Sequence, residues 1–236
     1  MPTNVRATSQ VVNPADLRPM PYGQASARSI RDAIFEPLWG GRRALVDLFG
    51  DELRIRDQDG EILDGYDLLR EAVREAAQAM ELVLDGYLLP APLRDTTGAE
   101  ALMGQGTVPT PAQMGRQLLI GGGLGSARRD QVEANQARQY PVASSSPTAF
   151  VAIDLLWLDG EPLVDVPLAE RKRLLDGVIR DCELVRRTVA VRAPVEAWYA
   201  QWRALGFHEV AVKGANSRYT PGVPSRDWAT ALIPRR

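Results

Sequence analysis

Apolar and polar residues alternate in two short stretches, 43–50 and 52–57, and this alternation predicts two strands. The DQDGE sequence at 57–61 is a turn signal. Over residues 66–80 the apolar positions change to helical spacing, with Glu and Arg on the opposite face. The apolar face of this predicted helix consists of Leu69, Val73, Ala76, Ala77 and Met80. Residues 81–90 predict a further strand that ends at a proline.

The second half of the chain returns to the same kinds of pattern. Residues 148–158 form a long apolar run, which predicts a buried strand closed by an Asp-Gly turn. Helices are predicted over 167–181 and 194–207, and strands within 182–193, at 208–214 and at 226–233. Strands and helices mixed without a regular βαβ rhythm favour an α+β domain with largely antiparallel sheets flanked by helices.

Two regions lack such patterns. Residues 1–30 are polar and punctuated by proline, and we expect an extended N-terminal arm. Residues 90–147 are rich in Gly, Pro, Ser, Ala and Gln, with a short helix expected at 111–119. The GGGLGS sequence at 121–126 has neither the Walker nor the dinucleotide spacing, which favours a surface loop. The predicted organisation is an arm followed by one domain over 31–236, with the loop-rich region inside it.

The composition is that of an ordinary globular protein. Of 236 residues, 45% are hydrophobic and 25% are charged. The apolar runs are too short to span a bilayer and the N-terminus lacks a signal sequence, so we expect a cytoplasmic protein without a membrane partner. The net charge is −2; residues 1–100 carry 11 Arg and 17 acidic residues (−6), and residues 101–236 carry 17 basic and 13 acidic residues (+4). This asymmetry gives weak support for a polyanion surface on the C-terminal part.

Three residue types are scarce enough to exclude classes of chemistry. Cys182 and His208 are the only cysteine and histidine, which excludes an internal disulfide, a thiolate metal cluster and a multi-histidine metal site. We interpret Cys182 as a packed thiol and His208 as a turn residue. Lys172 and Lys213 are the only lysines, and arginine stays protonated, so lysine-based covalent chemistry must use one of them. Lys172 lies in a run of charged residues and is expected on a solvated face.

Five segments, in order along the chain, resemble the motifs of one known family. The resemblance is carried by FEPLWGGRR, LVLDGYLLP, FVAIDLLWLDGEPLVDVPLAERKRLL, and FHEVAVKGANSRYTPGVPSRDWATALI, which spans two motifs. They are similar to motifs I, III, IIIa, IV and V of the adenylation (nucleotidyltransferase) domain of ATP-dependent DNA ligases, over about residues 30–233. The resemblance implies an ATP-grasp-like nucleotidyltransferase fold. It also implies a lysine amine that attacks the α-phosphate of ATP, with transfer of AMP to nicked DNA.

Most of the positions that carry this chemistry in the family hold a different residue here. Leu38 stands where the family has its nucleophilic lysine, and an aliphatic side chain has no lone pair. Gly40 replaces the motif I aspartate, and Tyr87 replaces the motif III glutamate that serves the sugar or metal. The remaining replacements are Ile153 for the adenine-stacking aromatic, Val210 for the glycine after the motif IV glutamate, and Thr230 and Leu232 for the two motif V lysines.

Several family residues do remain, and we expect most of them to be structural. They are Glu36, Gly41, Arg43, Asp85, Asp154, Glu209 and Lys213. We expect Arg43 to pair with Glu36, and Glu209 with Lys213, in partly buried ion pairs. The vestigial nucleotide pocket that the resemblance implies comprises Glu36, Leu38, Arg43, Tyr87, Ile153, Glu209 and Lys213, without a catalytic residue or a metal site.

The leading hypothesis is therefore a catalytically inactive DNA ligase-like domain, a binding or structural module linked to DNA repair. It needs no cofactor, and its pocket is narrowed by Tyr87, Leu38 and Ile153. One alternative is an active, divergent ATP- and Mg²⁺-dependent nucleotidyltransferase that uses Lys213. A variant of the first hypothesis is an accessory protein that binds DNA or a DNA-repair protein. The sequence ends at Arg236, just after motif V, so no OB-fold domain is expected. A superficial likeness to ligases in some other α+β domain is the remaining alternative.

Overall fold

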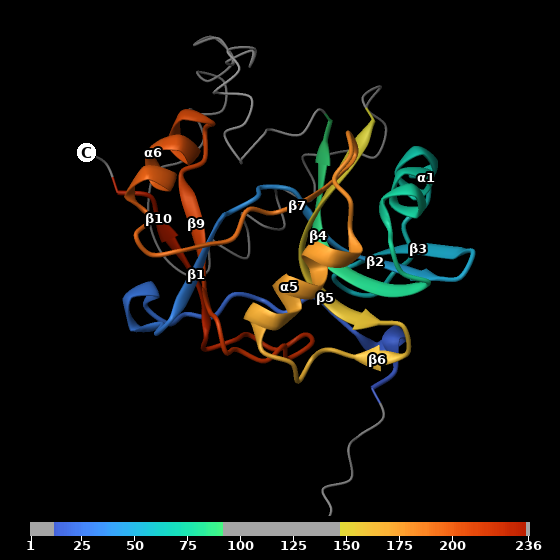
Figure 1. Cartoon of the computed structure of the whole chain (residues 1–236), viewed down its shortest axis with the longest axis horizontal. Coiled ribbons are helices and arrows are strands. Elements are labelled where there is room, and N and C mark those ends of the chain that lie inside the picture. The colour runs from blue at the N-terminus through green and yellow to red at the C-terminus, as the bar shows by residue number, and fades with distance from the viewer. Residues whose placement is uncertain (1–11, 92–146, 235–236) are drawn as a thin grey trace, which may run out of the picture.

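The computed structural model describes residues 12–91 and 147–234, and within them two β-sheets lie side by side (Figure 1). The larger sheet has the strand order β3-β2-β4-β5-β6, and β7 joins it by pairing in parallel with β5. Its strands are β2 (Arg42–Phe49), β3 (Glu52–Asp57), β4 (Glu81–Pro90), β5 (Thr148–Leu158), β6 (Glu161–Pro162) and β7 (Val185–Arg187). Every other pairing in it is antiparallel.

The smaller sheet is antiparallel throughout and has the order β10-β9-β1-β8. Its strands are β1 (Ala33–Pro37), β8 (Val191–Arg192), β9 (Glu209–Gly214) and β10 (Trp228–Leu232). Helix α6 (Glu196–Ala204) packs on it through Trp202, which is fully buried together with Val210 and Val212 of β9. The predicted α+β fold with largely antiparallel sheets is confirmed.

Helix α1 (Asp67–Ala76) packs on the main apolar core of the larger sheet, and helix α5 (Leu168–Val178) contributes Leu175 to the same core. The start of α5 belongs instead to the cluster that holds Ile34 and Trp228 of the smaller sheet. Both helices were predicted, but α1 is shorter than expected. The chain leaves the helix at Ala77, which bridges to Ile179, and Gln78 donates its N–H to the Val178 carbonyl. These contacts with the end of α5 extend the chain, so Met80 lies outside the helix and is 71% exposed, and its predicted place on the apolar face is wrong.

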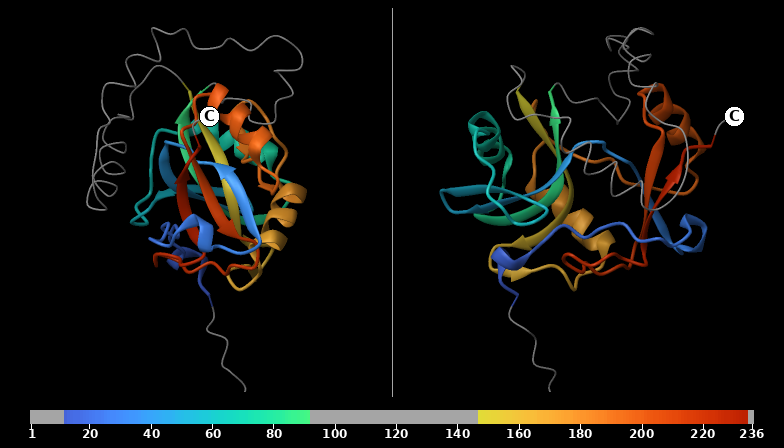
Figure 2. Two further views of the ribbon diagram at one scale, coloured as in Figure 1. Left: turned by 90° about the vertical axis from the view of Figure 1, so that its left-hand side faces the viewer. Right: turned by 180° about the vertical axis from the view of Figure 1, so that it is seen from behind.

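The N-terminal segment lies in the angle between the sheets from residue 12 onward (Figure 2). It contains the short 3₁₀ helices η1 (Pro14–Asp16) and η2 (Ala27–Ser29). Leu17 and Met20 are completely buried in a cluster with Trp228 of β10. This part of the predicted arm is therefore extended but belongs to the core.

The helix expected at 111–119 and the GGGLGS sequence fall outside the described residues. Among the helices that the structure does describe, none has the length and apolar character needed to cross a bilayer.

Candidate functional site

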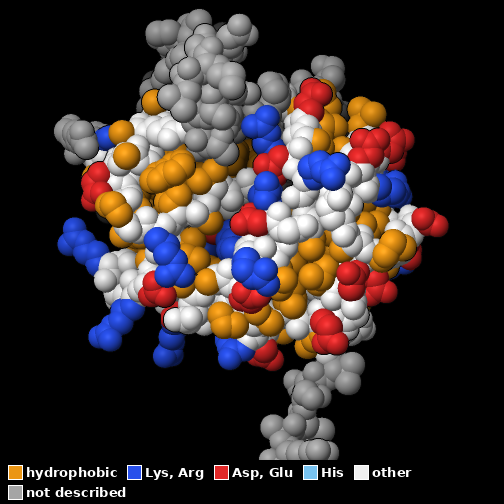
Figure 3. Space-filling view, in the orientation of Figure 1, with side chains coloured by type: hydrophobic (Ala, Val, Ile, Leu, Met, Phe, Trp, Pro, Cys, Tyr) orange, Lys and Arg blue, Asp and Glu red, His pale blue; other side chains and the backbone are white. Residues whose placement is uncertain are grey.

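The candidate site lies between the two sheets, and strand alternation selects the side chains that enter it. In β1, Phe35 turns toward α6, whereas Glu36 turns toward the larger sheet. In β9, Lys213 is the Cα partner of Ile34 and shares the face of Glu36. From β2 and β4, Arg43 and its register partner Tyr87 point back at them. Figure 3 shows a hollow between the two halves of the molecule with basic and acidic side chains around it.

Glu36 is the centre of a buried ionic trio. Its Oε2 accepts a hydrogen bond from Lys213 Nζ at 2.8 Å, and its Oε1 lies 2.5 Å from Lys172 Nζ in an ion pair. Lys172 Nζ also donates to the Ile153 carbonyl at 2.6 Å. Glu36 and Lys213 are 1% and 0% exposed, and Lys213 Nζ lies 4.1 Å from the ring centroid of Trp228. One carboxylate therefore holds both of the chain's lysines.

The prediction that Lys172 lies on a solvated face is wrong, since Lys172 is only 8% exposed. Its neighbours Glu170 and Arg173 pair with each other on the exposed side of α5. The packing of α5 against β5 turns Arg171 and Lys172 inward, where Asp154 and the Ile153 carbonyl are their partners.

Two further ion pairs complete the buried network. Arg43 reaches Asp85 through Nε at 2.5 Å and Nη2 at 2.6 Å, and Tyr219 donates its hydroxyl to the same carboxylate at 2.7 Å. Arg171 reaches Asp154 at 2.8 and 2.7 Å, and both of these side chains are fully buried. The predicted pairs Arg43–Glu36 and Glu209–Lys213 are wrong: Arg43 belongs to Asp85 and Lys213 to Glu36, because the strand register brings those groups together.

The network carries one excess positive charge. Its cations are Arg43, Arg171, Lys172 and Lys213, and its carboxylates are Glu36, Asp85 and Asp154. Burial opposes ionisation of Asp154, but the guanidinium of Arg171 outweighs it and holds the pKa of Asp154 below its ordinary value. Burial lowers the pKa of Lys172, and the charge of Lys213 lowers it further, although Glu36 acts in the opposite direction. The excess positive charge of the network thus contributes to the lowered pKa of Lys172.

Two tyrosines lie over Arg43. Tyr87 accepts a hydrogen bond from Arg43 Nη1 at 2.9 Å, and its ring centroid is 4.9 Å from the guanidinium carbon. Tyr22, from the N-terminal segment, is hydrogen-bonded to Tyr87, with its ring 5.8 Å from the same carbon and 5.8 Å from the Trp228 ring. Burial raises the pKa of Tyr22, so the phenol is neutral. Tyr22 was missed by sequence reasoning, because its partners are at least 21 residues away along the chain.

The other predicted pocket residues lie around this network. Leu38 follows β1, is half-buried, and donates its N–H to the Glu209 carbonyl at 3.1 Å. Ile153 is 1% exposed and packs in one cluster with Tyr87. Glu209 is half-buried at the opposite end of β9 from Lys213.

Two motif glycines have packing reasons to be glycine. A Cβ at Gly41 would lie 2.2 Å from the Leu88 carbonyl oxygen. A Cβ at Gly86 would lie 2.2 Å from the Val151 carbonyl oxygen. Their presence therefore says nothing about nucleotide chemistry, since the sheet alone requires them.

The carboxylates of the network are not free to hold Mg²⁺. A magnesium ion needs carboxylate ligands that are free to coordinate. Glu36, Asp85 and Asp154 each face at least one cation at 2.8 Å or less. Among the described residues, no group of three or more His, Cys, Asp and Glu side chains is placed to hold a metal ion.

Comparison with known proteins places the chain in context. The family described as ATP dependent DNA ligase domain matches residues 121–230. The DNA ligase of Methanopyrus kandleri is 30% identical over 229 residues, which is 88% of this chain and 36% of that protein. The DNA ligase of Methanoculleus marisnigri is 44% identical over 78 residues, or 33% of this chain and 14% of that protein.

Two solved structures have the same fold. Mycobacterial DNA ligase D, complexed with ATP and MES, superposes with a TM-score of 0.61 at 21% identity, covering 93% of this chain and 61% of that one. The ligase domain of M. tuberculosis LigD gives a TM-score of 0.60 at 22% identity, covering 94% and 61%. At these identities the likeness concerns the fold alone. The chain spans about a third of the M. kandleri ligase and less than two thirds of either solved chain.

Proposed function

This chain is a relative of the adenylation domain of ATP-dependent DNA ligases, and on that premise we propose that it is a ligase-like domain that forms no lysine–AMP intermediate. The observation that supports the proposal is the pairing of Glu36 with both lysines, next to Leu38 at the position of the nucleophile. Such a domain acts as a binding or structural module linked to DNA repair. It requires neither ATP nor Mg²⁺ for its role.

Few groups could act as the nucleophile, because only an uncharged amine attacks phosphorus. Lys213 is fully buried between Glu36 and the Trp228 ring, and its nitrogen is held by the Glu36 carboxylate. Lys172 has a lowered pKa, yet its nitrogen is directed at Glu36 and the Ile153 carbonyl. To reach an α-phosphate, either lysine must break the trio and leave Glu36 with one partner fewer.

Incubation with ATP labelled at the α-phosphate and Mg²⁺ tests the proposal. We expect no label on the denatured protein, and the same result for the matched variants Lys172→Arg and Lys213→Arg. Label on the wild-type chain would overturn the proposal. Loss of that label in only one of the two variants would then identify the nucleophile, and loss in Lys213→Arg would support the divergent enzyme.

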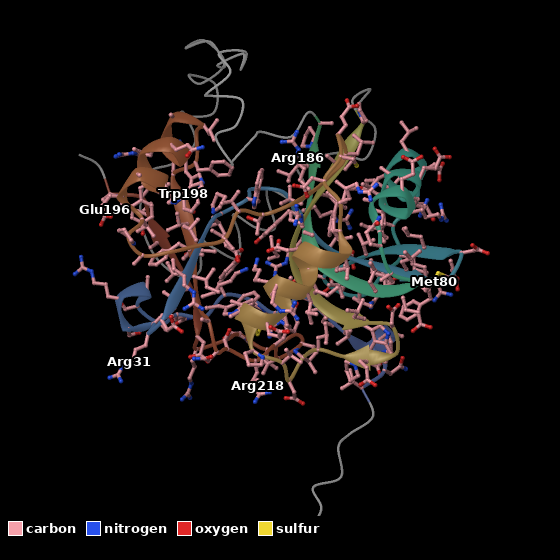
Figure 4. The ribbon with its side chains drawn as sticks, viewed as in Figure 1. Arg31, Met80, Arg186, Glu196, Trp198 and Arg218 are labelled. Carbon is pink, nitrogen blue, oxygen red and sulfur yellow. The ribbon has the colours of Figure 1, made fainter. Side chains whose placement is uncertain are left out.

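A row of exposed arginines favours DNA as the partner of such a module. Arg31 and Arg218 point outward along the lower edge of the molecule in the view of Figure 4, and Figure 3 shows further basic side chains along this edge. Arg28 and Arg226 are exposed as well, and none of these four arginines forms an ion pair with another described residue. Free guanidinium groups at a surface are suited to DNA phosphates.

Salt-dependent binding to a nicked duplex tests this second candidate. For the double variant Arg31→Ala/Arg218→Ala, we expect weaker binding and a log–log salt slope reduced by about two. The matched control is Arg54→Ala/Arg173→Ala, whose arginines are already paired with Glu52 and Glu170. Equal affinities and slopes for the two double variants would remove this edge as a DNA site.

A further inference from the structure

We propose that Tyr22 and Tyr87 together fill the part of the cleft that a nucleotide sugar would take, so that the domain excludes nucleotides with its own side chains. This inference rests on the proposed function and deepens it. Absence of a nucleophile would still permit reversible ATP binding, whereas a filled cleft forbids it. The inference also assigns a role to Tyr22, a specificity-determining residue from outside the ligase-like motifs.

Tyr22 and Tyr87 are here called the plug, and Tyr87 is its first half. It stands on β4 where the resemblance to ligases implies a glutamate serving the sugar or metal, and it is 7% exposed. Its ring stacks near the guanidinium of Arg43, its hydroxyl accepts from Arg43 Nη1, and its neighbour in the same cluster is Ile153. A neutral ring thus takes the place of a short carboxylate.

Tyr22 is the second half, and it comes from the opposite side of the cleft. Its hydroxyl meets that of Tyr87, and its ring lies beside Trp228 of the smaller sheet. Its ring also lies 5.8 Å from the guanidinium carbon of Arg43, so it borders the buried network. The two rings therefore bridge the two sheets, and a ligand that enters between the sheets would have to displace the rings.

The segment that carries Tyr22 is fixed at both ends. The Met20 N–H donates to the Tyr219 hydroxyl at 2.7 Å, and the Gly23 N–H donates to the Trp228 carbonyl at 2.8 Å. A Cβ at Gly23 would lie 1.8 Å from the Ser225 carbonyl oxygen, so the backbone at Gly23 packs directly against the backbone at Ser225. The plug is thus part of the folded core and does not act as a hinged lid.

All three nitrogens of Arg43 already donate to neighbouring side chains, which occupies three of its five N–H groups. Its Nε and Nη2 serve Asp85, and its Nη1 serves Tyr87. Loss of the two rings frees one arm of the guanidinium and the space above it, while the Arg43–Asp85 pair is kept. Variants of the tyrosines therefore open the cleft without removing a charge from the network.

The test is reversible nucleotide binding, measured by anisotropy of a fluorescent ATP analogue and by calorimetry with ATP and Mg²⁺. We expect no binding to the wild-type protein, and a gain in affinity of at least about tenfold for Tyr22→Ala/Tyr87→Ala. The ring-preserving variants Tyr22→Phe and Tyr87→Phe should behave as wild type. Tyr199→Ala, on α6 outside the cleft, is the matched control for loss of a tyrosine ring.

Two results would overturn the inference: wild-type protein that binds ATP as tightly as the double variant, or a folded double variant that gains nothing. Thermal unfolding establishes the folded state. If the double variant does not fold, Tyr22→Ala alone, which removes a half-exposed side chain, is judged by the same two results. Reversible binding of ATP to the wild-type protein would contradict only this inference, and the ATP would be recovered intact after denaturation. A covalent AMP adduct that survives denaturation would contradict the proposed function.

Discussion

Replacement of Glu36 by glutamine removes the one carboxylate that balances two buried ammonium groups. Each pair, with charges about 4 Å apart, contributes roughly 4 kcal/mol of attraction at an effective dielectric constant of about 20. The two ammonium groups, held on opposite oxygens of one carboxylate, are on the order of 5 Å apart and repel by roughly 3 kcal/mol. Glu36→Gln loses both attractions and keeps the repulsion. We expect it to lower the free energy of unfolding by about 3–5 kcal/mol, as for other broken buried pairs.

Lys172→Met is the matched variant, because it removes the surplus charge and keeps the aliphatic chain. Loss of one attraction is offset by relief of the repulsion and by the ammonium desolvation that is no longer needed. The Ile153 carbonyl loses a donor, which costs about 1 kcal/mol. We therefore expect a net change within about 1 kcal/mol of wild type, and partial rescue of Glu36→Gln in the double variant.

Urea denaturation of the four proteins at pH 7 provides these free energies and their coupling. The reasoning is refuted if Lys172→Met costs as much as Glu36→Gln. It is refuted equally if Glu36→Gln costs less than about 1 kcal/mol, since an uncompensated pair of buried ammonium groups cannot be that cheap.

Three further predictions concern the rest of the network. Asp154→Asn leaves the fully buried Arg171 unpaired and should cost about 3–5 kcal/mol at pH 7. Because the folded pKa of Asp154 lies below its ordinary value of 3.8, that benefit is lost as the pH falls through the folded pKa, and acid titration of stability should show the difference from wild type shrinking there. Tyr219→Phe removes a hydroxyl donor from Asp85 and should cost about 1.5–3 kcal/mol in chemical denaturation. NMR titration of ¹³C-labelled lysine should give Lys172 a pKa below its ordinary 10.5, so that stability rises with pH between the folded value and 10.5; a value at or above 10.5 contradicts the burial argument.

Apolar runs and turn signals were sufficient to predict the central strands. The runs at 81–90 and 148–158 became β4 and β5 with the predicted bounds, since long β-rich runs flanked by proline or Asp-Gly have few alternatives. Helices α5 and α6 lie within their predicted ranges. Strand β1 was not predicted, because it is only five residues long and shows too little alternation of apolar and polar residues.

The partners within the site could not be predicted, because they depend on three-dimensional position. A run of charged residues around Lys172 does not reveal which side of α5 meets β5. The choice of Asp85 over Glu36 as the partner of Arg43 follows from the register of β2 and β4. Tyr22 enters the site only because residues 20–23 pack across β10. The residue types at the motif positions indicated which catalytic groups are missing. The side-chain contacts now made at those positions could be found only from the structure.

The mass of the intact wild-type protein after incubation with ATP and Mg²⁺ tests the central claim most directly. With both lysines held by Glu36 and Leu38 in place of the nucleophile, we predict a single species at the mass of the unmodified chain. A species heavier by one AMP, mapped by peptide sequencing to Lys172 or Lys213, would contradict the account.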